Sequence, residues 1–155
     1  MTGRRVRRNR KGQFEIRLPE PERELLRSLG PQLREVINDE DDDAAVARLF
    51  PVAYRDDPDR ETEFRLLARD ELRSSHLAAL ATLEESAGAE RLEEEQLLAW
   101  MRAINDVRLV LGTRLDVTEE GHERPADLTD ARAPAFAVYD FLSWLQGEIV
   151  DALGP

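Results

Sequence analysis

The spacing of the apolar residues constrains this fold most, because they recur every three or four positions along most of the chain. This spacing places them on one face of an α-helix, and such a face is stable only when it packs against another element. The pattern therefore predicts an all-α, mainly helical fold, a bundle of about four to five helices. It runs through four long segments, at about residues 21–38, 58–85, 91–117 and 134–153.

Glycine and proline positions suggest where these helices begin, end and pack. Gly30-Pro31 interrupts the first segment, so we expect a kink or a break into two helices there. Asp57-Pro58 is a typical helix start, and Gly88 ends that helix. Gly112 and Gly147 lie inside predicted helices and suggest close helix packing. A short helix is expected at 44–50, and Trp100 and Trp144 are expected in the core.

The first 18 residues differ from the rest. Residues 4–8 and 13–18 alternate polar and apolar side chains, and Asn9 and Gly12 between them suit a turn, so the sequence predicts a β-hairpin. An isolated hairpin is marginally stable, so it should lie on the helices through Phe14, Ile16 and Leu18. We therefore divide the 155 residues into a basic hairpin or arm, 1–18, and a helical bundle, 19–155, within a single domain.

Charge is distributed unevenly. The net charge is −11, yet six of the 22 basic residues and none of the 33 acidic residues lie in residues 1–11. A basic arm on an acidic body indicates binding to nucleic acid or to an acidic protein, although an arginine-rich edge strand can also serve only to resist aggregation. The candidate binding residues are Arg4, Arg5, Arg7, Arg8, Arg10 and Lys11.

Residues for catalysis or for a metal are not arranged in any familiar motif. Glu119 and His122 have the spacing of a carboxylate-bridged metal site, but there is one copy, with Gly121 inside it. The acidic run 39–43 lacks the pattern of a calcium loop. The sequence does not identify an acid–base partner for His76. We expect no catalytic residues, no metal and no cofactor, and therefore no enzyme.

The absence of cysteine excludes disulfides and thiol chemistry within this chain and is compatible with a cytoplasmic location. No apolar run approaches the length of a membrane span, so we expect no membrane association.

Three stretches carry a resemblance to a known family. They are LFPVAYRDDPDRETEF at 49–64, WMRAINDVRLVLGTRLDV at 100–117 and YDFLSWLQGEIVDAL at 139–153. Together they resemble an actinobacterial family first catalogued as a domain of unknown function and now described as oxidative-stress transcriptional regulators. The chain has 21 arginines and one lysine, a ratio that suits a coding sequence of high GC content and is consistent with an actinobacterial origin.

The resemblance implies a transcription-associated regulator that binds a sigma factor or RNA polymerase, with promoter DNA as a further candidate partner. A homodimer is a reasonable state for a regulator and for a protein with so many leucine-faced helices. Redox sensing through paired thiols cannot occur here, because the chain has no cysteine. Two other classes stay open: an adaptor that binds proteins without contacting DNA, and a hydrolase or metal-dependent enzyme, which would need His76, His122 and acids to meet in one pocket.

Overall fold

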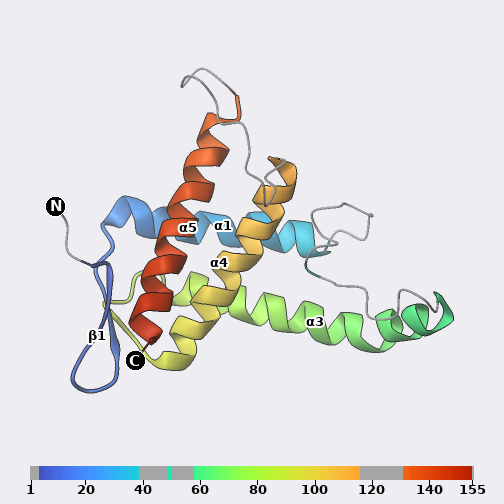
Figure 1. The fold of residues 1–155 in the computed structure, drawn as a ribbon, viewed down its shortest axis with the longest axis horizontal. Helices are drawn as coiled ribbons and strands as arrows, with labels where there is room; N and C mark the ends of the chain where they lie inside the picture. Colours follow the sequence, from blue (N-terminus) through green and yellow to red (C-terminus); the bar gives the residue numbers. More distant parts are fainter. Residues whose placement is uncertain (1–3, 39–48, 50–57, 116–130, 155) are drawn as a thin grey trace.

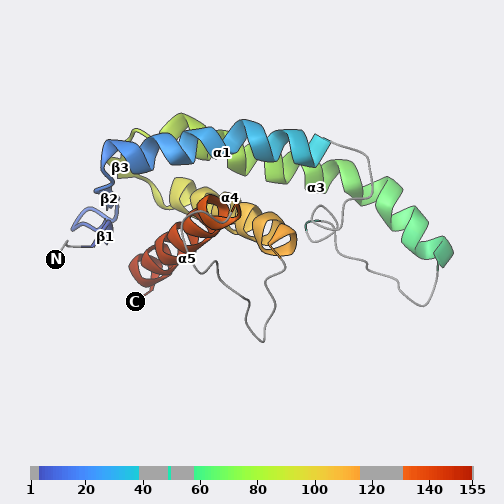
Figure 2. The ribbon, with the colours of Figure 1, turned by 90° about the horizontal axis from the view of Figure 1, so that it is seen from above.

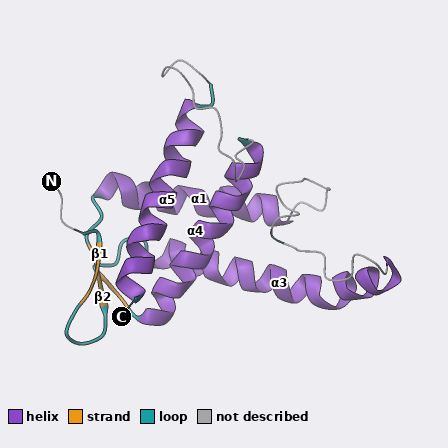
Figure 3. Ribbon diagram, viewed as in Figure 1, coloured by secondary structure: helices purple, strands orange, loops and turns teal. Residues whose placement is uncertain are grey.

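The computed structural model describes residues 4–38, 49, 58–115 and 131–154 (Figure 1). These residues form four helices and a small antiparallel sheet, which confirms a mainly α fold with an N-terminal hairpin (Figure 3). The helices are α1 (Glu20–Asn38), α3 (Pro58–Ser86), α4 (Glu94–Arg114) and α5 (Ala133–Leu153), and the strands are β1 (Val6–Arg8), β2 (Phe14–Ile16) and β3 (Arg91–Leu92). The acidic run 39–43, the expected helix 44–50 apart from Leu49, and the Glu119/His122 pair lie outside the described residues.

The helices pack in the way their apolar faces require. α1 and α3 lie side by side, α4 packs against α3, and α5 packs against α4 (Figure 2). One continuous core joins these helices to the inner face of the sheet, which contributes Val6, Phe14, Ile16 and Leu92. No described helix is both long enough and apolar enough to span a bilayer.

The sheet has the strand order β1-β2-β3, and the third strand corrects our prediction of a helix starting at residue 91. Arg91 and Leu92 are extended and pair with Glu15 and Phe14 of β2. Helix α4 begins only after Glu93, whose side chain and that of Gln96 form a reciprocal capping box. The hairpin itself is confirmed, with Gly12 at a φ of 82° in the turn, a conformation that glycine adopts without strain.

Helix α1 runs through Gly30-Pro31 without a break, so of the kink or break that we expected there, the break into two helices was wrong. The apolar residues on both sides of the proline share one buried face, and burying Leu33 and Ile37 contributes about 1.5 to 3 kcal/mol each, which offsets the lost hydrogen bond. Gly30 is needed for another reason: a Cβ there would overlap the side chain of Glu84, which crosses α1 to pair with Arg34.

The buried side chain of Arg23 joins the sheet to the helices. Its guanidinium donates hydrogen bonds to four main-chain carbonyl oxygens, at 2.8 to 2.9 Å. Two acceptors, Ile16 and Leu18, belong to or follow β2, and the other two, Ala87 and Ala89, follow α3. Carbonyl groups at the C-terminal end of a helix favour a cation, which helps to hold this charge in the interior.

The two tryptophans have different environments. Trp100 is fully buried, and its indole N–H donates to the Ser86 hydroxyl at 2.7 Å, as expected for a core residue. Trp144 was wrongly assigned to the core, because its side chain is 44% exposed. Gly112 is buried in α4, as close packing requires, but Gly147 on α5 is exposed and a Cβ there would meet nothing within 4 Å. Close packing therefore does not explain Gly147.

Candidate functional site

The outer face of the sheet gathers basic side chains from three separate parts of the chain. Arg7 on β1, Glu15 on β2 and Arg91 on β3 are aligned across the strands by the pairing register. Because side chains alternate between the two faces of a strand, this row lies opposite the buried Val6 and Ile16. Two cations therefore flank one carboxylate on the solvent side.

The hairpin turn and the end of β2 extend this row. Arg10, Lys11 and Arg91 line one polar hollow of about 280 Å³ together with Glu15. Arg17 continues β2 and pairs with Glu15 at 3.1 Å. We call this the basic sheet surface, defined by Arg7, Arg10, Lys11, Arg17 and Arg91, all of which are exposed.

Most of these charges are not neutralised. Arg7, Arg10, Lys11 and Arg91 form no ion pair with any residue in the described part of the chain. An exposed cluster of one sign attracts an oppositely charged partner, and the attraction weakens as salt screens it.

Two of the predicted binding residues have intramolecular partners instead. The Arg5 guanidinium lies 3.6 Å from the Glu22 carboxylate and 5.7 Å from the centre of the Trp144 ring. Its backbone N–H donates to Glu148 at 2.8 Å. Arg8 lies 5.1 Å from the centre of the Phe14 ring and 4.0 Å from Glu94. Arg5 in particular ties the start of β1 to the helices, and Arg4 is exposed just before β1.

Sequence reasoning missed Arg17 and Arg91. Arg17 follows an apolar position in the alternating pattern of β2, so its exposure could have been read from the sequence. Arg91 could not, because it joins the surface only through the pairing of β3 with β2, and those strands are distant in sequence.

His76 on α3 and Asp106 on α4 form a buried polar pair. The His76 Nδ1 lies 2.7 Å from the Asp106 Oδ2, and the Nε2 donates to the Leu49 carbonyl at 3.1 Å. His76 is 6% exposed and Asp106 is 4% exposed. Both ring nitrogens are therefore occupied inside the protein, an arrangement that joins helices and presents no open nitrogen to a substrate. Within the described residues, no three His, Cys, Asp or Glu side chains are grouped to hold a metal.

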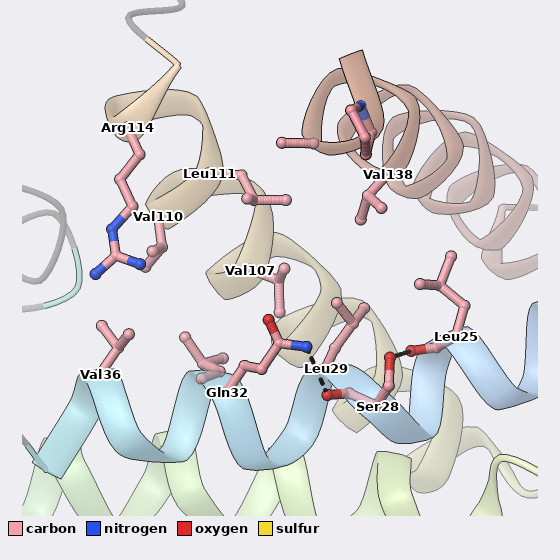
Figure 4. Close-up of a pocket in the computed structure, with 13 residues that line it drawn as sticks. Leu25, Ser28, Leu29, Gln32, Val36, Val107, Val110, Leu111, Arg114 and Val138 are labelled. Atoms are coloured by element: carbon pink, nitrogen blue, oxygen red, sulfur yellow. Dashed lines mark hydrogen bonds between the residues drawn. The ribbon is translucent and has the colours of Figure 1, made fainter. Parts of the chain in front are cut away.

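A second hollow, of about 240 Å³, lies between α1, α4 and α5 and has mainly apolar walls. Leu111, Val107 and Val138 extend into it, and Arg114 stands at its edge (Figure 4). The two dashed hydrogen bonds in Figure 4, from Ser28 to Leu25 and from Gln32 to Ser28, stay within α1. The walls hold no acid–base pair, so we assign no chemistry to this hollow.

Comparison with known proteins gives a family and named relatives. The profile of the family described as Domain of unknown function (DUF2017) matches residues 2–153. A Mycobacterium leprae protein named putative oxidative stress regulator AosR is 35% identical over 72% of this chain and 59% of its own length. The Mycobacterium tuberculosis oxidative stress regulator AosR is 32% identical over 70% of this chain and 57% of its own length. The match thus spans less than two thirds of these relatives, and no solved structure matches.

Proposed function

Because the chain belongs to the DUF2017 family, whose relatives include proteins named oxidative stress regulators, we propose that it regulates the oxidative-stress response by binding a partner. The basic sheet surface is the contact, and a sigma factor or RNA polymerase is the partner. The protein performs no chemistry of its own in this role.

The observation that carries this proposal is the concentration of unpaired cations on an otherwise acidic molecule. The whole chain holds 22 basic and 33 acidic side chains, so the basic sheet surface is a local exception. The basic surface would attract a partner's acidic patch while the acidic rest of the molecule would repel it. This difference would orient the partner and speed its binding at low salt.

An acidic protein surface fits the geometry better than DNA does. Glu15 stands in the middle of the cation row, and Glu90, Glu93, Glu94 and Glu95 are exposed beside β3 and at the start of α4. A duplex carries phosphates along its whole length and would meet these carboxylates as well as the arginines. A protein can place its acids opposite Arg7 and Arg91 alone.

Charge reversal at single positions tests the proposal. The full chain and its Arg91→Glu and Arg7→Glu variants are assayed for binding to purified RNA polymerase holoenzyme and, separately, to a promoter DNA fragment. We expect each substitution to weaken holoenzyme binding about tenfold, equivalent to 1.4 kcal/mol, and the native affinity to fall as salt is raised. Arg102→Glu is the matched control, since Arg102 is exposed on α4, away from the sheet, and the substitution changes the charge equally.

Three results would contradict the proposal. Equal holoenzyme affinity for the native chain and both sheet variants would remove the basic sheet surface as the contact. Loss of promoter-fragment binding with unchanged holoenzyme binding would assign the surface to DNA. No binding of the native chain to either would reject the transcription partner.

A further inference from the structure

The C-terminal half of α5 carries large apolar side chains that the described fold leaves exposed. Three large apolar side chains are exposed among the described residues, and two of them, Trp144 at 44% and Val150 at 52%, belong to this helix. Figure 2 shows this half of α5 on the side of α4 that faces away from α1 and α3. Exposed apolar side chains that are grouped in this way indicate a site of association.

Gly147 lies between these two side chains, three residues after Trp144 and three residues before Val150. It is exposed, and a Cβ added to it would meet nothing within 4 Å. Glycine weakens the interior of a helix relative to alanine, and nothing in the described part of the chain requires the missing side chain here. A glycine does, however, allow another backbone to approach closely.

The exposed ring of Trp144 is held in place from two sides. The ring of Phe141 packs against it, with the ring centroids 6.0 Å apart. The guanidinium of Arg5, at the start of β1, lies 5.7 Å from its centre. A tryptophan that is already ordered loses little conformational freedom when it binds, and such residues often contribute most of the binding energy of an interface.

A second copy of the chain fits this face when the two α5 helices cross antiparallel at Gly147. Trp144 and Val150 lie at equal distances along the sequence from that residue, so Trp144 of each copy is level with Val150 of the other. An interface with two-fold symmetry has to be self-complementary in this way. The two glycines meet at the crossing, where side chains would hold the helices apart.

The charges favour the same arrangement. α5 carries the acids Asp140, Glu148 and Asp151 and no basic residue. A parallel pair would set each acid level with its own copy, whereas the antiparallel pair sets Asp151 level with Ser143. Arg108 is held at that level, because its Nε donates to the Ser143 hydroxyl at 2.9 Å. Neither Asp151 nor Arg108 forms an ion pair with any described residue, so each copy offers the charge that the other lacks.

We propose that the chain forms a homodimer through α5, with the two helices antiparallel and crossing at Gly147. Trp144 packs beside Val150 of the other copy, and Asp151 is attracted to Arg108 of the other copy. A single pair of helices buries less surface than the about 1,600 Å² of a standard interface, so we expect a dissociation constant in the micromolar range. The inference does not depend on the proposed function.

Sedimentation velocity of the full chain over a wide range of concentrations tests the dimer and its crossing point. Gly147→Gln places a long polar side chain at the crossing, and the open space around Gly147 leaves the monomer intact. We expect this variant to dimerise at least about tenfold more weakly than the native chain. Its urea midpoint should stay the same or rise, because glutamine favours a helix more than glycine does.

Ala137→Gln is the matched control, because Ala137 is exposed on α5 outside the crossing, and this variant should dimerise like the native chain. Two results would overturn the inference: a native chain that stays monomeric at every concentration, or a Gly147→Gln variant that dimerises as tightly as the native chain.

Exchange of charges between copies tests the antiparallel arrangement. Asp151→Arg and Arg108→Glu each bring like charges together in a homodimer, so each variant alone should stay monomeric at concentrations where the native chain is dimeric. Mixed in equal amounts, the two variants should form a heterodimer, since both contacts then pair opposite charges again. Glu24→Arg is the control for charge, because Glu24 is exposed on α1. A mixture that remains monomeric, while circular dichroism shows both variants to be folded, would overturn the proposed crossing.

Discussion

At the residue scale, the contact between His76 and Asp106 shows how a polar pair is accommodated in an apolar core. The His76 Nδ1 lies within hydrogen-bond distance of the carboxylate, and the Nε2 lies within hydrogen-bond distance of the Leu49 carbonyl oxygen. Every polar atom of the imidazole therefore has a partner, as burial demands. The apolar spacing of α3 indicated a helical His76 near the core. Its partner was not predictable, because spacing within one helix does not fix which residue of another helix it meets.

Replacing one member of this pair should destabilise the protein more than replacing both. Asp106→Leu is expected to lower the free energy of unfolding by about 3 kcal/mol, because it leaves a buried ring nitrogen without an acceptor. The double variant His76→Leu/Asp106→Leu should lose clearly less than the sum of the two single losses, since no unpaired group remains at that contact. Urea denaturation followed by circular dichroism measures all three variants.

Asp151→Leu provides the control for this cycle, because Asp151 is an exposed aspartate on α5 and its replacement should change stability by no more than about 0.5 kcal/mol. Strictly additive losses for the single variants at 76 and 106 would mean that the observed contact contributes no coupling energy.

At the scale of elements, helix α1 shows tertiary packing overriding a local signal. A proline inside a helix ordinarily breaks or kinks it, and this rule led us to expect a kink or a break at Pro31. Pro31 is exposed, however, and the buried residues Leu26, Leu29, Leu33 and Ile37 lie along one face on both sides of it. The helix periodicity predicted the buried face correctly, and the break that the proline rule allowed does not occur. The start of α4 was missed for a related reason, because the pairing of residues 91 and 92 with a distant strand leaves no local signal.

Pro31→Ala should therefore stabilise the protein. The substitution restores a main-chain hydrogen bond in the helix interior and removes the ring, which is worth up to about 3 kcal/mol. Thermal unfolding followed by circular dichroism should show a higher Tm. Pro21→Ala is the matched control, because Pro21 lies in the first turn of α1, where a main-chain N–H would have no helical partner. The Tm of the Pro21→Ala variant should stay the same or fall slightly. A lower Tm for Pro31→Ala would show that the proline fits a bend which the helix requires.

At the scale of the whole molecule, the sequence revealed the basic character of the N-terminus but not its architecture. Charge counting predicted an arm, and the alternating pattern predicted a hairpin resting on the helices. The structure unites these: the hairpin is part of a sheet that shares the helical core, through Val6, Phe14 and Ile16. The cations form a surface only because β3 brings Arg91 beside β2, and this depends on the fold of the entire chain.

Because the basic hairpin is part of the core, deleting the basic residues is an unsuitable test of their binding role. Removing residues 1–11 deletes β1, the fully buried Val6 and the contacts of Arg5 with Glu22 and Glu148. It also uncovers Phe14 and Ile16, so we expect the free energy of unfolding to fall by about 3 kcal/mol or more. Such a chain would lose partner binding through loss of structure, whatever the arginines contribute.

Neutralising the exposed cations separates the two effects. A variant with glutamine at Arg4, Arg7, Arg10 and Lys11 keeps β1 and its buried contacts, because all four side chains are exposed. Its stability in urea should stay within about 1 kcal/mol of the native value, while its binding to RNA polymerase holoenzyme should weaken by at least about tenfold. If deletion of residues 1–11 instead left the urea midpoint unchanged, β1 would not be part of the core. The basic residues would then act as an arm after all.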